Sequence, residues 1–367
     1  MNDSLFLHKD HLLPLLRRLS RQYRLVAPVR NELGDTLYTS ITDLDQVCID
    51  LDHQPQNTLK PFFFPQDEIL ASYTVDRDPV SHALSQRFFP LLPENRPTLY
   101  FGVRPCDLFG VFYMDLVFLG GKYPDIYYEQ RRKSALFLVL GCNHPFANCF
   151  CNATRTGPFL ESGYDLQLTD LGPDTKGFYI EVGKASGSRI VRELVHFFRP
   201  ASEDEDRFQY QRVLESRGLF QQLVHVDLAC RLLEQGQDTG AIIADLSSRC
   251  QDCGGCAHVC PTCTCFTISD RQRDPDSGER VRSWDACTFA GFTLMAGGHN
   301  PVNIKRERIK RRFYHKLKSD VERHGRPSCV GCGRCVDICF GGVDIIRFIH
   351  RLTDLDEAQT STGGKET

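Results

Sequence analysis

The sequence predicts an α+β chain made of an N-terminal α/β domain and a second, mostly helical domain that is rich in cysteine. Short apolar segments alternate with helical patterns over the first half, which is typical of a sheet covered by helices. Helical patterns then dominate from about residue 200 onward. The chain has 367 residues, enough for two domains, and 17 of them are cysteines.

The N-terminal elements follow from apolar periodicity and from the positions of proline and glycine. An amphipathic helix is expected around 12–19, with Asp10 able to cap it. The segment 61–65 is expected to be extended, because proline stands at both ends. The other expected strands are 24–29, 36–41, 98–103, 135–141 and 178–182, and the other expected helices are 106–119, 191–198 and 202–233.

Four cysteines of this domain lie at or near the ends of predicted strands. Cys106 and Cys142 each follow a strand, and Cys149 and Cys151 come soon afterwards in a loop. Open α/β sheets bind their ligands at the carboxyl ends of strands. We therefore expect these four thiols to converge on one face of the domain.

The C-terminal half contains two cysteine runs with the same spacing, Cys-x2-Cys-x2-Cys-x3-Cys. This spacing places three thiolates around one [4Fe–4S] cluster and sends the fourth to a neighbouring cluster. The expected first cluster is held by Cys250, Cys253, Cys256 and Cys339, and the expected second cluster by Cys329, Cys332, Cys335 and Cys260. A pair of zinc knuckles is the alternative, but four ligands at one zinc ion explain only part of each run.

The remaining cysteines allow several interpretations. Cys106, Cys142, Cys149 and Cys151 are candidates for a third [4Fe–4S] cluster, with Asp107 as an alternative oxygen ligand. Isolated buried thiols and a structural zinc site are the competing interpretations. A further group is expected to pack beside the first cluster rather than to bind metal, and two cysteines without companions are expected in the core. The packing group is Cys263, Cys265 and Cys287, and the two core cysteines are Cys48 and Cys230.

Composition and missing motifs exclude several classes of function. A net charge of −3 predicts neither nucleic acid nor an anionic membrane as a partner. We find no signal peptide and no membrane span, so a cytoplasmic location is expected, where cysteines stay reduced. No dinucleotide fingerprint, phosphate-binding loop or hydrolase motif occurs, and no catalytic residue is assigned. The segment 305–318 carries eight Lys and Arg against one Glu, which favours a solvated helix face over the alternative of a docking surface.

The expected domain limits are 1–215 for the α/β domain and 216–355 for the domain with the two cysteine runs. An insertion at 261–328 interrupts the second domain, and 271–282 within it should form a hairpin-like loop. Residues 356–367 are expected to be a disordered tail.

Several motifs in one order resemble a family of iron–sulfur subunits. They are Phe101-Gly102-Val103-Arg104-Pro105-Cys106-Asp107, Gly141-Cys142, Cys149-Phe150-Cys151-Asn152, Cys260-Pro261-Thr262-Cys263-Thr264-Cys265, Trp284-Asp285-Ala286-Cys287 and Ala296-Gly297-Gly298-His299-Asn300. From near the N-terminus to about residue 350, the chain resembles the family that contains sulfhydrogenase beta subunits and the corresponding iron–sulfur subunit of anaerobic sulfite reductase. Phe340 departs from the family pattern, which has proline after the cysteine at position 339.

The resemblance implies a 4Fe-4S dicluster subunit that relays electrons from a flavin subunit using NAD(P)H to a terminal enzyme. That enzyme is a [NiFe] hydrogenase, with small and large subunits, in the sulfhydrogenase type, which Trp284-Asp285 and 296–300 favour. A sirohaem sulfite reductase subunit takes its place in the alternative type. Two other hypotheses are a reductase with an open iron site at Cys106 and Cys142, and a redox-sensing binding protein.

Overall fold

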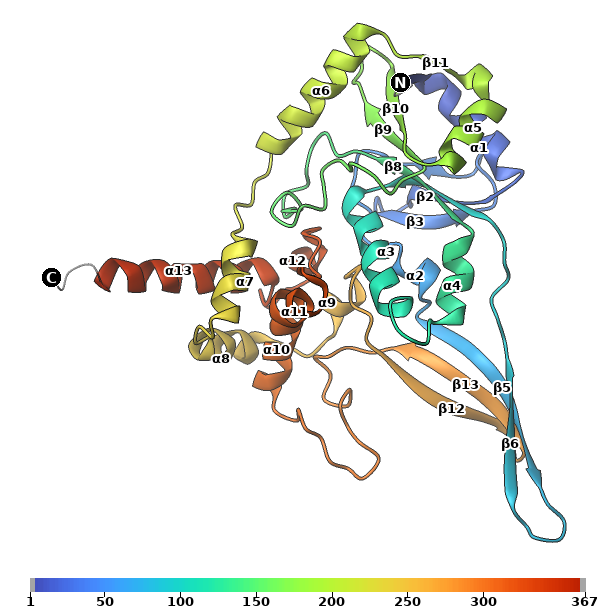
Figure 1. Cartoon of the computed structure of the whole chain (residues 1–367), viewed down its shortest axis with the longest axis vertical. Coiled ribbons are helices and arrows are strands. Elements are labelled where there is room, and N and C mark those ends of the chain that lie inside the picture. The colour runs from blue at the N-terminus through green and yellow to red at the C-terminus, as the bar shows by residue number, and fades with distance from the viewer. Residues whose placement is uncertain (1–3, 364–367) are drawn as a thin grey trace.

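A nine-stranded mixed sheet forms the centre of the N-terminal half (Figure 1). The computed structural model describes residues 4–363, with side chains for 4–356. Four neighbouring strands in the middle of the sheet, β2, β7, β8 and β9, run parallel, and the other pairs are antiparallel. In spatial order the strands are β11 (Phe198–Pro200), β1 (Leu5–His8), β10 (Gly177–Val182), β9 (Leu166–Asp170), β8 (Ala135–Leu140), β7 (Thr98–Val103), β2 (Arg24–Arg30) and β3 (Thr36–Ile41), and β4 (Cys48–Ile49) pairs with β2.

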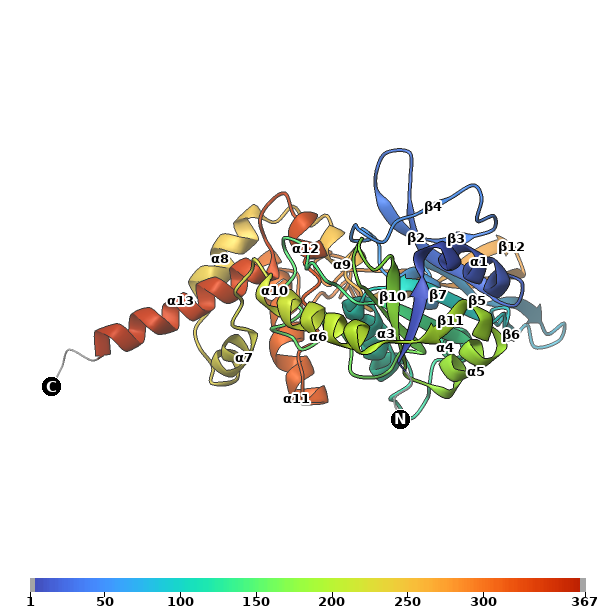
Figure 2. The same cartoon turned by 90° about the horizontal axis from the view of Figure 1, so that it is seen from above.

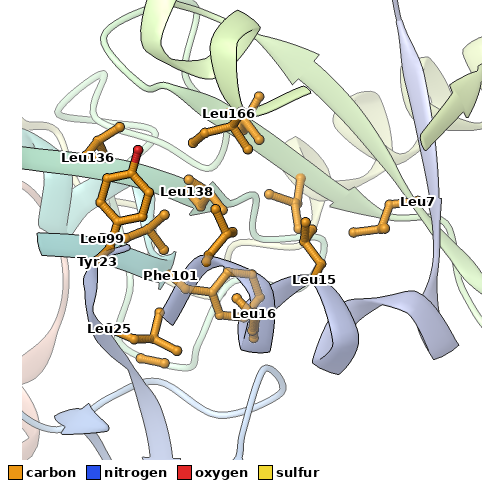
Figure 3. Packing of buried hydrophobic residues seen from close by; sticks show 14 of the residues in the cluster. Leu7, Leu15, Leu16, Tyr23, Leu25, Leu99, Phe101, Leu136, Leu138 and Leu166 are labelled. Carbon is orange, nitrogen blue, oxygen red and sulfur yellow. The ribbon is translucent and has the colours of Figure 1, made fainter. Parts of the chain in front are cut away.

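Helices cover both faces of this sheet, so its central strands are buried on both sides. On one face of the sheet, Leu99 and Phe101 of β7 pack with Leu16 of helix α1 (Figure 3). On the other face, Tyr100 and Val103 of β7 pack into a separate apolar core. The first face is covered by α1 (Lys9–Ser20) and α5 (Ala185–Glu193), and the second by α2 (Lys60–Phe63), α3 (Pro105–Phe118) and α4 (Ile126–Lys133). A short 3-10 turn, η1 (Val195–Phe197), follows α5.

A second sheet of four strands joins parts of the chain that are about two hundred residues apart. The segment expected as a hairpin-like loop is a β-hairpin, and its second strand pairs with a strand from the N-terminal half. The order is β12 (Phe266–Asp274), β13 (Ser277–Trp284), β5 (Asp67–Arg77) and β6 (Leu84–Pro90). These strands extend away from the body of the molecule in Figure 1.

The C-terminal half packs several helices around a second apolar core that includes Ile309, Phe313 and Phe348. Because the hairpin belongs to the same half, the chain has mixed α and β structure there, and the expected mostly helical domain is not confirmed. From residue 203 onward the helices are α6 (Glu203–Gly218), α7 (Val226–Glu234), α8 (Gly240–Arg249), α9 (Gly255–His258), α10 (Lys305–Tyr314), the π-helix η2 (His315–Ser319), α11 (Asp320–His324), α12 (Arg334–Asp337) and α13 (Ile345–Gly363). Of these, α7, α8, α10, η2 and α13 contribute buried residues to this core. Figure 2 shows α13 projecting from this half.

Some expected elements differ in the structure. The segment expected to be extended forms the short helix α2 instead. Pro61 lies in the first turn of this helix, where a backbone N–H makes no hydrogen bond within the helix, so proline is tolerated there. The helix expected at 191–198 begins earlier and breaks at Leu194. The helical stretch expected over 202–233 is interrupted between α6 and α7. Of the tail expected to be disordered, α13 covers residues up to Gly363, and residues 364–367 lie outside the described part.

Within the described residues, no helix combines the length and the apolar character that a membrane crossing requires.

Candidate metal centre

Cysteines from the two C-terminal runs line two neighbouring cavities. Each cavity is bordered by three cysteines of one run and by the last cysteine of the other. Cavity A is lined by Cys250, Cys253, Cys256 and Cys339. Cavity B is lined by Cys329, Cys332, Cys335 and Cys260, and Cys256 also borders it. Each cavity is therefore lined by a set of four cysteines whose sulfur atoms are the donor type that iron–sulfur clusters use. The assignment of individual cysteines as cluster ligands stays a prediction.

The same backbone device turns both runs into their cavities. Gly254 and Gly333 stand between the second and third cysteine of each run and have φ angles of 71° and 77°. Each is the residue before a short helix, α9 or α12, that carries the third cysteine. Only glycine adopts this left-handed conformation readily, so the tight turn between the cysteines depends on it.

A third cavity, cavity C, lies in the N-terminal half. It is lined by Cys106, Cys142, Cys149 and Cys151, with Arg104 and Gln54. Strands β7 and β8 are parallel neighbours, so the residues that follow them, Cys106 and Cys142, meet at one edge of the sheet. The structure thus brings together four thiols that are spread over 46 positions of the sequence.

All four thiols of cavity C are deeply buried, with exposures between 5% and 8%. Burial raises the pKa of the Cys142 thiol, while the guanidinium of Arg104, 3.9 Å from its sulfur, partly opposes this. Burial likewise raises the pKa of Cys149 to about 12. Such thiols lose their protons readily only when a metal ion or a nearby positive charge stabilises the thiolate.

Asp107, considered above as an alternative ligand, is engaged elsewhere. Its two carboxylate oxygens accept hydrogen bonds from the guanidinium of Arg334, both at 2.8 Å. One of these oxygens also accepts a hydrogen bond from the Tyr38 hydroxyl at 2.9 Å. Asp107 and Arg334 are 1% and 3% exposed. Because Arg334 stands between Cys332 and Cys335, this buried ion pair connects the N-terminal half directly to the second cysteine run.

Cavities B and C share a wall made of backbone. Phe150 donates its N–H to the carbonyl oxygen of Gly331 at 2.8 Å, and the thiol of Cys149 lies 3.5 Å from the carbonyl oxygen of Cys332. Gln54 donates to that same Cys332 carbonyl at 2.8 Å. The two halves therefore meet through the loops that carry the cysteines.

The basic segment of α10 and η2 faces inward at three positions. Arg308, Arg312 and Lys316 are buried and recur every fourth residue, so they share one side of the helix. Arg312 borders both cavity A and cavity B, and Lys316 borders cavity B. The expected solvated helix face is wrong for these three residues. Ile309, Phe313 and Leu317 recur at the same spacing beside them, a signal that could have identified the buried side.

The inward cations contact the cavity walls closely. The ammonium of Lys316 lies 3.4 Å from the Cys260 sulfur and donates to the Thr262 hydroxyl at 3.0 Å. Burial by itself would lower the pKa of Lys316, but the sulfurs of Cys260 and Cys263 raise it well above its ordinary value. Arg308 donates to the Asp252 carboxylate at 3.2 Å. Positive charge is therefore held beside both thiol sets.

Of the surplus cysteines in the described part of the chain, Cys263, Cys265 and Cys287 each pair with another thiol, whereas Cys48 and Cys230 do not. The thiols of Cys260 and Cys263 hydrogen bond to one another, which lowers the pKa of Cys260 and raises that of Cys263. Cys265 and Cys287 are paired in the same way at the base of the hairpin. Cys48, expected in the core, is exposed because it lies in a two-residue edge strand. Cys230 is partly buried against the second core.

Cavity A is the one closest to the surface. Cys253 is exposed, and the two apolar side chains that border the same cavity, Ile338 and Phe340, are 48% and 80% exposed. In the part of the chain that the structure describes, no three His, Cys, Asp or Glu side chains come together closely enough to bind one metal ion. In all three cavities the thiols are arranged around the walls of a space instead.

Comparison with known proteins identifies the part of the chain that holds cavities A and B. Residues 249–343 match the family model described as "4Fe-4S dicluster domain". This segment is a 4Fe-4S dicluster domain. A dicluster domain implies iron–sulfur clusters, and the walls of cavities A and B supply the thiols for them.

The similarity to known proteins extends beyond the dicluster domain to nearly the whole of this chain. The chain is 28% identical to sulfhydrogenase 2 subunit beta of Pyrococcus furiosus over 349 residues, which cover 95% of this chain and 98% of that protein. The resemblance predicted from the sequence is thereby confirmed.

Proposed function

We propose that this chain is an electron-transfer subunit that holds three [4Fe–4S] clusters. The cysteines of cavities A and B would hold two of them, with the crossed ligand sets expected from the spacing, and the cysteines of cavity C would hold the third. When bound, such clusters accept and donate single electrons. The observation that carries the proposal is the presence of three cysteine-lined cavities of which B borders both A and C.

The protein's own residues would give each centre a distinct environment. Cavity C is lined by four buried thiols, the buried Arg104 and the partly buried Gln54. Cavity B lies in the middle, next to Arg312 and Lys316. Cavity A reaches the surface at Cys253, where a partner chain could approach. The burial of cavity C speaks against an open iron site for substrate at Cys106 and Cys142.

The partners proposed are a flavin subunit that uses NAD(P)H and a cytoplasmic [NiFe] hydrogenase. The similarity to a protein named as a sulfhydrogenase subunit supports the hydrogenase-type assembly. A sirohaem sulfite reductase subunit is the alternative terminal partner. Purification of the native complex under anaerobic conditions, followed by mass spectrometry of its subunits, distinguishes the two terminal partners. A [NiFe] hydrogenase large subunit in the complex would support the hydrogenase. A sirohaem protein in its place would support the sulfite reductase.

The number of clusters is tested by iron and sulfide analysis of the anaerobically purified chain. We expect about twelve iron atoms per chain, four for each [4Fe–4S] cluster, because three sets of four thiols are available. The Cys142→Ser variant should lose about four of them, since it removes one wall of cavity C. The Cys48→Ser variant is the control and should keep its full iron content, because Cys48 is exposed on an edge strand. Eight iron atoms in the unmodified chain, unchanged by Cys142→Ser, would limit the proposal to cavities A and B.

A further inference from the structure

Five buried cations stand beside the cysteines of the dicluster domain. Lys60, from the N-terminal half, donates to the backbone carbonyls of Ala257 and Cys263 and borders neither cavity A nor cavity B. The other four belong to the dicluster domain and fall into two kinds. Arg308 and Arg334 are paired with carboxylates, those of Asp252 and Asp107. Arg312 and Lys316 have no ion-pair partner among the described residues. Arg312 donates to the backbone carbonyl of Val343, and Lys316 donates to the Thr262 hydroxyl and contacts the Cys260 sulfur.

Burying an unpaired charge is costly unless another charge compensates for it. Arg312 and Lys316 are 6% and 8% exposed. The groups around them that are able to carry negative charge are chiefly cysteine sulfurs, with the Tyr113 hydroxyl also beside Lys316. A [4Fe–4S] cluster held by four thiolates is negatively charged, and each electron it accepts adds a further negative charge. The two unpaired cations are therefore placed to stabilise the reduced form most strongly.

The two cations are distributed unequally. Arg312 borders cavity A and cavity B, whereas Lys316 borders cavity B alone. Lys316 is carried by the π-helix η2, whose wider turn is an uncommon feature that is frequent at functional sites. The middle centre of the three therefore receives more uncompensated positive charge than the one that opens to the surface.

We propose that Arg312 and Lys316 set the reduction potentials of the two dicluster centres: Arg312 raises both potentials, and Lys316 raises that of the centre in cavity B alone. The proposal rests on the function proposed above. Net charge is one of the factors that determine iron–sulfur potentials, so the physical basis is the Coulomb attraction between fixed cations and the reduced centre. Arg312 and Lys316 are positioning residues in this account, since they act through the clusters.

The test is an anaerobic redox titration of the full chain, followed by electron paramagnetic resonance, in four variants. Lys316→Gln should lower the midpoint potential of one dicluster centre by 59 mV or more, which is a tenfold change in a one-electron equilibrium, and leave the other unchanged. Arg312→Gln should lower both. Lys316→Arg should restore the unmodified value, because it keeps the charge. Arg311→Gln is the matched control from the same helix: Arg311 borders neither cavity A nor cavity B, and no shift is expected.

The outcomes separate this proposal from the one on which it rests. An unmodified chain that contains no iron would refute the proposed function itself. Full iron content with unchanged potentials in Lys316→Gln and Arg312→Gln would overturn the role of the cations alone, as would equal shifts of both centres in Lys316→Gln. If a variant loses part of its iron, the potential is still read from the remaining clusters, because each signal is normalised to its own maximum.

Discussion

Replacing Gly331 with alanine is expected to destabilise the chain strongly and to reduce its iron content. Gly331 has a φ of 61°, and a Cβ atom there would lie 2.6 Å from the backbone atoms of Phe150 and Cys151. A left-handed alanine costs about 1–3 kcal/mol, and forcing an extra carbon into a packed site adds about 1–3 kcal/mol. Urea unfolding should therefore show a loss of roughly 2–6 kcal/mol.

The matched control for this substitution is Gly325→Ala. Gly325 has a similar φ of 71°, but a Cβ atom there would meet nothing within 4 Å. It should cost only the backbone strain, about 1–3 kcal/mol, without the added cost of the steric clash, and keep its iron. Because Gly331 separates cavities B and C, its variant should lose iron from both. Equal stability of the two variants would show that the loops carrying the cysteines are not packed as described.

Breaking the buried ion pair is expected to have a comparably large effect. Asp107→Asn leaves the guanidinium of Arg334 buried without a compensating charge, which typically costs about 3–5 kcal/mol. The free energy of unfolding, measured by urea titration of the anaerobic protein, should fall by that amount. A double variant, Asp107→Asn with Arg334→Met, should recover part of the loss, because no charge then remains unpaired.

A surface ion pair that also has two hydrogen bonds provides the control. Arg280 donates two hydrogen bonds to Asp270, both at 2.8 Å, but each side chain is 38% exposed. Asp270→Asn should therefore cost no more than about 1 kcal/mol, as solvent replaces the lost partner. A loss in Asp107→Asn as small as in Asp270→Asn would mean that the connection between the two halves does not depend on this pair.

Both predictions concern contacts that the sequence did not reveal. The strands at 36–41 and 98–103 were predicted with the bounds that the structure has, because buried strands carry a strong local pattern. The short helix after Lys60 was missed, since proline at both ends of a segment suits an extended stretch as well as the first turn of a helix. The burial of Arg312 and Lys316 was missed because a basic segment usually faces solvent.

The sequence by itself determined the features that depend on neighbouring residues: the cysteine spacing that lets each run surround one space, and the strand ends that carry Cys106 and Cys142. The tertiary structure alone decided which cations remain unpaired beside cavities A and B, that Asp107 pairs with Arg334, and that cavities B and C share a wall. Some of these contacts join residues more than two hundred positions apart. They arise when separate cores pack together, and no periodicity within a local segment of sequence specifies such packing.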